Sequence, residues 1–337
     1  MKKILIAAAC MSIAGGVQAQ SNVTMYGVVD QYMDFSQHGQ GHAARIQSGG
    51  IYGSRLGVKG EEMLGGGLKA QFVLEAGIDA DTGASGQGGI LFGRQSYVGL
   101  EGNLGRLTLG RQYSMYSETQ ANYGLGGGQG WGNANNYFNE GSILRVDNSV
   151  KYESPSFSGL VFKGMFGLGE NVASGQRSVG NLGSVSGQYD RGPFSIGMSY
   201  SVKQSASNNR EKWAAVGTYY DFGPIKPGFL LTHVRDEIGL NRNNTYELSA
   251  EIPLPGSSLL VDIGYFRNYA FDHANATSYS LRYDYYLSKR TTLYTGVAMI
   301  RNGSNAAFTI GGATGSGLPG PAGSNARSVI AGIRHIF

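Results

Sequence analysis

Cysteine, proline and long apolar runs are all scarce in this sequence of 337 residues. Its one cysteine, Cys10, lies in an N-terminal segment that we expect to be removed, which leaves no thiol for a disulfide, a zinc site or nucleophilic catalysis. After residue 20 no uninterrupted apolar run approaches the roughly 20 residues that a transmembrane helix needs. Together with a mean hydropathy of −0.19, this excludes a helical membrane protein.

Glycine and tyrosine are abundant instead, with 55 and 21 residues. Glycine costs about 1 kcal/mol relative to alanine inside a helix, so this composition disfavours helices. With only eight prolines and 11% aromatic residues, the chain is neither collagen-like nor plainly disordered. An ordered all-β protein remains.

The N-terminus has the features of a secretory signal peptide. Lys2 and Lys3 precede an apolar stretch over residues 4–13, and residues 17–19 (VQA) fit a small-residue cleavage site. We expect residues 1–19 to be cleaved and residues 20–337 to form a single exported domain. Loss of the two lysines takes the basic residues from 27 to 25 against 23 acidic ones, a near balance that gives no support for nucleic-acid binding.

Short segments with a period of two recur along the mature chain. In residues 193–203 apolar side chains alternate with small or polar ones, and residues 67–78, 245–252 and 278–287 repeat the pattern. Such a period gives a strand one apolar and one polar face. A soluble β-sandwich and a transmembrane barrel both produce it. Tyr and Phe at the segment ends, together with the signal peptide, favour a barrel in an outer membrane.

The connections between these segments alternate in length. Short turns are expected at 63–66, 103–105, 154–158, 190–193, 221–224, 253–257 and 287–290. Longer polar connections are expected at 36–52, 79–90, 113–142, 170–182, 203–212, 236–243, 271–276 and 302–325. Short turns at one end and long loops at the other are typical of outer-membrane barrels. Seven turns and eight loops predict a 16-stranded antiparallel transmembrane β-barrel.

The chain ends in an aromatic residue, Phe337, on an alternating strand. This resembles the C-terminal signal by which outer-membrane barrels are recognised for insertion. A closed barrel leaves no exposed strand edge. The last strand is therefore expected to pair with the first, near residues 22–35.

Seven short motifs follow one another from the first strand to the last: VTMYGVVD (23–30), GSRLGVKGEE (53–62), GRQSYVGL (93–100), LGRQ (109–112), RVDNSVKY (145–152), YYLSKRTTLY (285–294) and GIRHIF (332–337). Together they resemble the general porins of β-proteobacteria, which are Gram-negative outer-membrane proteins. Glu62-Met63 is a minor departure, since Glu-Asp is commoner there.

The resemblance implies a homotrimeric, water-filled diffusion channel in the outer membrane of a Gram-negative bacterium. Small hydrophilic solutes and ions would pass through its pore. The barrel would have short turns on the periplasmic side and long loops on the extracellular side. The resemblance also implies that the third long loop, residues 113–142, folds into the lumen and narrows it. Neither the trimer nor the inward fold of the loop follows from the residue pattern alone.

Four arginines in the matched motifs resemble the basic wall residues that face the constriction in this family: Arg55, Arg94, Arg145 and, with a more ambiguous strand phase, Arg111. Arginine stays charged at any relevant pH and offers a fixed fork of donors to a passing anion. The alternative is that these residues stabilise loops or lie in the headgroup zone.

The third loop contains two acidic residues, Glu118 and Glu140, and no Lys or Arg. Facing a basic wall, they would create a transverse field across the pore. With more arginines than carboxylates, the constriction is expected to be net positive and to prefer anions mildly.

Other functions stay open at this point. A substrate-specific channel for sugars or organic acids would use a lumenal aromatic track and show saturable flux. A barrel enzyme would need a nucleophile or activated water near a histidine, and the five histidines lie in no such motif. We therefore expect no enzyme activity, no catalytic residues, no cofactor and no metal site. Adhesion through the long loops could coexist with transport.

Overall fold

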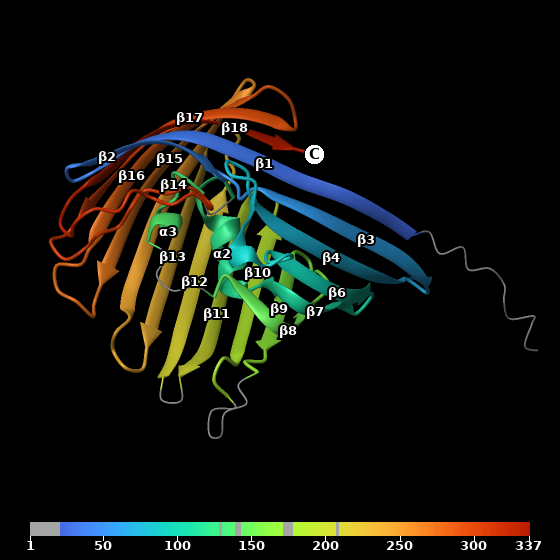
Figure 1. The fold of residues 1–337 in the computed structure, drawn as a ribbon. Helices are drawn as coiled ribbons and strands as arrows, with labels where there is room; N and C mark the ends of the chain where they lie inside the picture. Colours follow the sequence, from blue (N-terminus) through green and yellow to red (C-terminus); the bar gives the residue numbers. More distant parts are fainter. Residues whose placement is uncertain (1–20, 128–129, 139–142, 171–177, 207–208) are drawn as a thin grey trace, which may run out of the picture.

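The computed structural model describes residues 21–127, 130–138, 143–170, 178–206 and 209–337. These residues form one antiparallel sheet that curves round and closes on itself as a barrel (Figure 1). The expected signal peptide, residues 1–19, lies outside the described residues. No helix in the described part of the chain is long and apolar enough to cross a membrane.

The sheet is built from strands that follow one another round the barrel in sequence order. They are β1 (Ser21–His38), β2 (Gly41–Ser48), β3 (Arg55–Gly65), β4 (Leu68–Asp79), β5 (Ala84–Ser85), β6 (Gln95–Gly102), β7 (Gly105–Tyr113), β8 (Arg145–Glu153), β9 (Leu160–Gly167), β10 (Leu182–Arg191), β11 (Phe194–Ala206), β12 (Asn209–Tyr220), β13 (Lys226–Asp236), β14 (Arg242–Leu254), β15 (Ser257–Asn268), β16 (Ala276–Tyr286), β17 (Thr291–Asn302) and β18 (Ala326–Ile336). Helical segments are η1 (Gln87–Gly89), α2 (Met115–Tyr123), η2 (Leu125–Gly127) and α3 (Ala134–Tyr137).

The wall of the barrel contains sixteen strands in the described residues, as the sequence predicts. β2 and β3 both pair with β1, one beside its second half and the other beside its first half. They therefore count as a single wall strand that residues 49–54 interrupt. β5 is two residues long and pairs only with the end of β4, inside a loop.

The barrel closes where the first and last strands meet. β1 and β18 pair from Val28 opposite Ile336 to His38 opposite Ala326. Beyond the strand, the backbone N–H groups of Gly27 and Phe337 each donate to the other residue's carbonyl, at 3.0 and 3.1 Å. A Cβ at Gly27 would lie 2.4 Å from the Phe337 ring, so only glycine fits there. The expected closure is confirmed.

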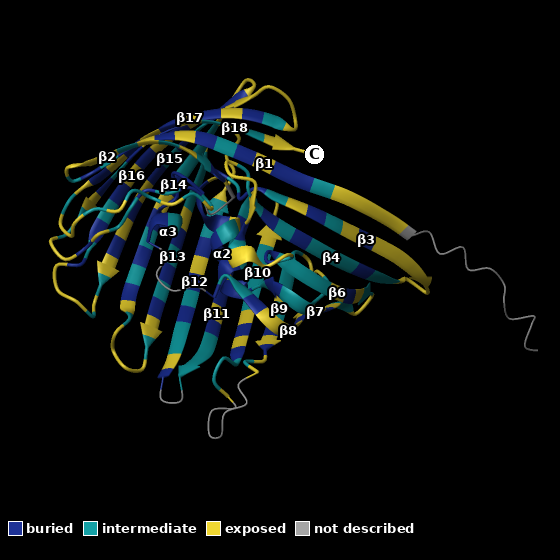
Figure 2. Cartoon of the chain, viewed as in Figure 1, coloured by how far each residue is buried: buried dark blue, intermediate teal, exposed yellow. Residues whose placement is uncertain are grey.

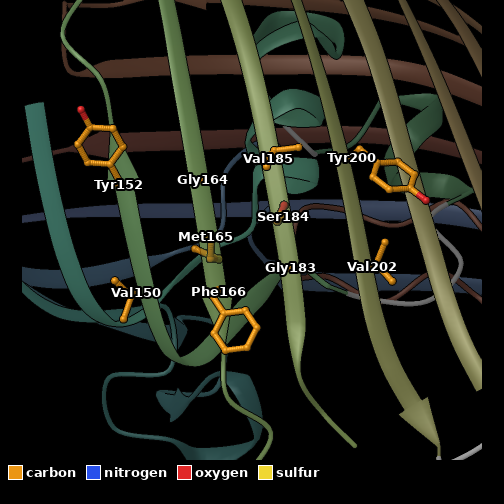
Figure 3. Close-up of a pocket in the computed structure, with 10 residues that line it drawn as sticks. All are labelled: Val150, Tyr152, Gly164, Met165, Phe166, Gly183, Ser184, Val185, Tyr200 and Val202. Atoms are coloured by element: carbon orange, nitrogen blue, oxygen red, sulfur yellow. The ribbon is translucent and has the colours of Figure 1, made fainter. Parts of the chain in front are cut away.

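Side chains alternate across the wall as expected from the period of two. On β11, Ser195, Ser199 and Ser201 are buried and point inward, whereas Met198 and Tyr200 are exposed on the outer face. Figure 2 shows the same alternation as buried and exposed bands along the strands. The outer face is apolar, and Figure 3 shows one stretch of it over β8–β11, with rings and methyl groups around glycines.

Two expected loops are instead largely strand. Residues 36–52 were predicted as a connection, but β1 continues to His38 and turns back through Gly39, with a φ of +59°, into β2. Residues 203–212 likewise belong mostly to β11 and β12. Both stretches extend the wall beyond its apolar band, so their polar side chains resemble those of a loop. The residue composition of these two stretches does not reveal that they pair as strands.

Candidate functional site

The chain between β7 and β8 enters the barrel and packs against one side of its inner wall, as the sequence comparison implied for residues 113–142 (Figure 1). Ser114 caps α2, its Oγ accepting a hydrogen bond from the Ser117 N–H at 3.1 Å. α2 lies against β10, β11 and β12, and α3 lies against β14 and β15. Residues 128–129 and 139–142 of this loop, including Glu140, lie outside the described residues.

Two glycines in the wall make room for the end of α2. A Cβ at Gly217 would lie 2.3 Å from Tyr123, and one at Gly197 would lie 2.6 Å from its ring. The Tyr123 hydroxyl is 2.9 Å from the Ser195 Oγ. Burial raises the pKa of Tyr123 to about 12, and that of Tyr116 on the same helix to about 12. Both phenols are therefore neutral at ordinary pH.

One wall carboxylate fixes the middle of the loop. Glu247 of β14 is 1% exposed, and its Oε1 accepts the Leu125 N–H at 2.8 Å. Its Oε2 accepts the Asn135 backbone N–H at 3.1 Å, and also the Asn135 side-chain amide. These bonds satisfy backbone donors that would otherwise be buried without a partner.

The tip of the loop is tied to the opposite side of the barrel. The Trp131 indole donates to Ser328 Oγ at 3.2 Å, and its backbone N–H donates to the Gly50 carbonyl at 2.9 Å. Arg282 of β16 donates to the Trp131 carbonyl at 2.8 Å while pairing with Asp284. The loop therefore follows the inner wall from β10, where α2 packs, round to β16 and β18, where Trp131 is bound.

The interruption between β2 and β3 also turns inward. The buried carboxylate of Asp30 accepts the backbone N–H groups of Gly50, Ile51 and Tyr52 at 3.2, 3.1 and 2.8 Å. This short segment places Tyr52, three residues before Arg55, in the lining of the same cavity as Arg55. Charge-assisted bonds to several N–H groups hold such a turn strongly.

A cavity of about 260 Å³ remains between α2 and the part of the wall that includes β3, β7 and β8 and the residue before β6. The residues that line it are Ile51, Tyr52, Gly53, Arg55, Arg94, Tyr113, Ser117, Glu118, Ala121, Asn122, Leu144, Arg145 and Ala313. Three of the four arginines identified from the sequence are among them, and they come from three different strands or strand ends. The cavity therefore has a basic wall on one side and a helix on the other.

The three arginines are held in place by two shared partners. Arg94 donates from Nε to Glu75 Oε1 at 2.8 Å and from Nη2 to the Tyr113 hydroxyl at 2.8 Å. Arg145 donates to the same hydroxyl at 3.0 Å, with its guanidinium 4.8 Å from the Tyr113 ring centroid. Arg55 Nε lies 3.7 Å from Glu75 Oε2. Glu75 thus compensates two of the guanidinium groups with a single negative charge, and the wall keeps a positive excess.

The acidic residue of α2 is engaged by lysines. Glu118 Oε2 lies 3.0 Å from Lys163 Nζ on β9, and its Oε1 pairs with Lys151 on β8. Lys163 also lies 3.2 Å from Glu153. Glu118 lines the cavity, but its charge is compensated locally. It therefore opposes the arginine wall less than the sequence analysis anticipated.

Arg111 lies elsewhere. Across β6 it is opposite Ser96, two residues along from the exposed pair Leu109 and Val98, so it shares their outward face. Its Nε donates to the Gly93 carbonyl at 2.8 Å, and its Nη1 pairs with Asp147. The sequence analysis expected this residue at the constriction. Arg111 is absent from the residues that line the cavity, so we leave it out of the proposed constriction.

Sequence reasoning missed four residues that shape the cavity. Glu75 and Tyr113 orient the arginines, and Lys151 and Lys163 compensate Glu118. The alternation of β4 had already placed Glu75 on the polar face, which was the available signal. The lysine pairing depends on the position of α2 inside the barrel, and no local pattern encodes that.

In comparisons with known proteins, residues 6–305 match the family described as Gram-negative porin. Outer membrane porin protein 32 of Delftia acidovorans is 32% identical over the full length of both chains. An outer membrane porin protein of Bordetella pertussis is 29% identical over 87% of this chain and 93% of its own. The solved anion-selective porin from Comamonas acidovorans is 29% identical, covers 94% of this chain and 100% of its own, and superposes with a TM-score of 0.84.

Proposed function

Because this chain belongs to the Gram-negative porin family and is an outer-membrane β-barrel, we propose that it is a general diffusion porin with a mild preference for anions. In this proposal it passes small hydrophilic solutes and ions passively, without a bond-forming or bond-breaking step. The constriction is the cavity between α2 and the arginine wall. Its basic residues are Arg55, Arg94 and Arg145.

The observation that carries the proposal is the charge of that wall. Of the three guanidinium groups, two share the carboxylate of Glu75 and the third, Arg145, contacts Tyr113, while the nearby Glu118 is compensated by two lysines. Fixed charges at the narrowest point of a pore set its ion preference. In a low-dielectric wall they also raise the local concentration of counter-ions. A positive excess here therefore favours chloride and small organic anions over potassium. The anion-selective porin from Comamonas acidovorans, at 29% identity, is consistent with this sign.

We also propose that the channel is a homotrimer. A fold-level neighbour, OmpT of Vibrio cholerae, was solved in a trimer form with a TM-score of 0.69 at 16% identity. That likeness concerns the fold, so the assembly of this chain rests on the family. Chemical crosslinking of the detergent-purified protein tests it, with a three-subunit band as the expected result and a monomer alone as the contrary one.

Single-channel recording in a planar bilayer tests the pore itself. We expect conductance that rises linearly with KCl concentration, in steps grouped by three. Saturating conductance, or block by one class of sugar or organic acid, would instead indicate a substrate-specific channel. Absence of conductance from a correctly folded barrel would contradict both.

A further inference from the structure

The connection between β17 and β18, residues 303–325, reaches the constriction. Ala313 of this β17–β18 loop lines the cavity between α2 and the arginine wall. Its backbone N–H donates to the Gly50 carbonyl at 3.0 Å. The side-chain amide of Asn136, on α3, donates to the Gly312 carbonyl at 3.1 Å. The β17–β18 loop therefore packs on the loop that carries α2 and α3 and forms part of the constriction.

One histidine holds the other end of the β17–β18 loop. His38 is the last residue of β1 and is 1% exposed. Its Nδ1 lies 3.0 Å from the Leu318 carbonyl oxygen, and its Nε2 lies 3.2 Å from the Ser324 carbonyl oxygen. A Cβ at Gly320 would lie 2.3 Å from the ring, so only a glycine lets the loop pass this close to the imidazole. Both ring nitrogens therefore point at carbonyl oxygens of the same loop.

These two contacts need two N–H donors, because a carbonyl oxygen only accepts. A neutral imidazole has one N–H and one lone pair, whereas an imidazolium has two N–H groups. The Ser324 carbonyl already accepts the Asn302 side-chain amide at 2.9 Å, so the single proton of a neutral ring is better placed on Nδ1, toward Leu318. The Nε2 lone pair then faces the Ser324 oxygen at 3.2 Å. Protonation replaces this repulsion with a charge-assisted hydrogen bond.

The charged groups that face His38 come from β1 and β2. The β17–β18 loop contains no Asp, Glu, Lys, Arg or His. The residues directly opposite His38 are Ala326 on β18 and Gly41 on β2. On β1 the nearest charged residue on the same face is Asp34, which pairs with Arg45 of β2 at 2.5 Å. The partners of the ring are therefore carbonyl dipoles of the loop and not a carboxylate.

We propose that His38 is a positioning residue that holds the β17–β18 loop at the constriction when its ring is protonated and loosens the loop when the ring is neutral. Histidine changes charge between pH 5 and 8. At pH 5 both loop contacts are hydrogen bonds, and Ala313 stays in the cavity wall. At pH 8 one contact is lost, residues 318–324 are held less firmly, and the constriction becomes wider and less constant. This role presupposes the proposed channel function and makes the width of the pore depend on pH.

Single-channel recording of the purified protein in planar bilayers tests this role. Conductance and open-channel current noise are measured at one KCl concentration, at pH 5 and at pH 8. We expect the wild type to conduct about 1.5-fold more at pH 8, with more noise, because pore diameter controls the flux. The variant is H38Q, whose amide does not titrate, so its conductance should be the same at both pH values. A heat-modifiability gel shift verifies that every barrel is folded.

H42Q is the matched control. His42 is exposed on the outer face of β2, where it lines a surface hollow together with Phe35. This variant loses the same kind of titratable group and should keep the pH dependence of the wild type. Equal wild-type conductance at both pH values would overturn the proposal. A pH dependence that persists in H38Q, or that H42Q also abolishes, would do the same. Absence of conductance from all three folded barrels would overturn the proposed function and this role with it.

The protonation state of the ring is measured separately by NMR. One variant keeps His38 and replaces the other four histidines with Gln, so its ¹⁵N-histidine signals belong to His38 alone. At pH 5 both ring nitrogens should have the chemical shifts of an imidazolium, and at pH 8 those of a neutral ring protonated on Nδ1. A ring that is neutral at pH 5 would overturn the proposal, whether or not H38Q folds.

Discussion

Lys163 Nζ on the barrel wall lies 3.0 Å from Glu118 Oε2 on α2, the helix packed inside the lumen. With Lys151 on the other carboxylate oxygen, the wall both positions α2 and cancels its only described acidic charge. Across the cavity, Glu75 pairs with Arg55 and Arg94, and Arg145 contacts the neutral Tyr113. The excess positive charge of the constriction thus has two sources: the number of arginines in the wall, and the pairing of Glu118 with lysines instead of with those arginines.

Replacing Glu118 with Gln should strengthen the anion preference. The substitution removes one negative charge and leaves Lys151 without its carboxylate partner near the cavity, whereas Lys163 keeps Glu153. We expect the chloride-to-potassium permeability ratio to rise about two- to threefold at low salt, since about 1 kcal/mol acts between unit charges a few ångströms apart in water. Reversal potentials measure it. E237Q, which loses the same charge at the loop end beside Lys212, serves as control and should leave the ratio unchanged.

Replacing Arg145 with Gln should weaken the anion preference. Its guanidinium lines the cavity and stacks on Tyr113. R111Q makes the same change in charge at an arginine that does not line the cavity and is expected to preserve wild-type selectivity. Equal effects of the two substitutions on reversal potential would show that selectivity comes from the overall charge of the barrel and not from this wall.

Replacing Glu247 with Ala should loosen the loop inside the lumen. The substitution leaves the N–H groups of Leu125 and Asn135 without their acceptor. An unsatisfied buried donor costs about 1–3 kcal/mol. We expect a lower thermal unfolding midpoint and larger, noisier single-channel currents. Glu251, on the same strand but only partly buried, provides the control E251A. Unchanged current noise in E247A would mean that other contacts suffice to hold the loop.

The buried phenol of Tyr116 predicts loss of stability at alkaline pH. Burial raises its pKa from the ordinary value of 10.0 to about 12. The folded barrel therefore keeps a proton that the unfolded chain releases above pH 10. This contribution to stability is complete below pH 10 and is lost as the pH rises through 12. Denaturation midpoints between pH 8 and pH 12 should fall less steeply in Y116F; parallel slopes would exclude this residue as a source of the pH dependence.

The sequence alone predicts the wall well, because a strand between lipid and water has only two environments. The alternation in residues 193–203 corresponds to β11, and the short turns fall where strands end. Residues 36–52 were misassigned as a loop because the wall continues past the membrane there, and both faces become polar. Where a strand extends beyond the apolar part of the membrane, its side chains no longer alternate between apolar and polar, so the sequence pattern no longer identifies it as a strand.

The site was only partly predictable. Arg55, Arg94 and Arg145 were chosen by resemblance, and all three line the cavity. Arg111 sits in a similar motif, but the strand irregularity between Gly110 and Gln112 obscures which face it takes. The compensation of Glu118 by Lys151 and Lys163 joins a loop helix to two strands. A contact of that kind depends on how the loop folds inside the closed barrel.

The central claim is that a positively charged wall sets the ion preference of this channel. The reversal potential of the purified wild-type protein across a KCl gradient in a planar bilayer tests it most directly. The arginine wall predicts a reversal potential displaced toward the chloride equilibrium potential, with a smaller displacement at high salt because exposed charges are screened. A displacement toward the potassium equilibrium potential would contradict the account.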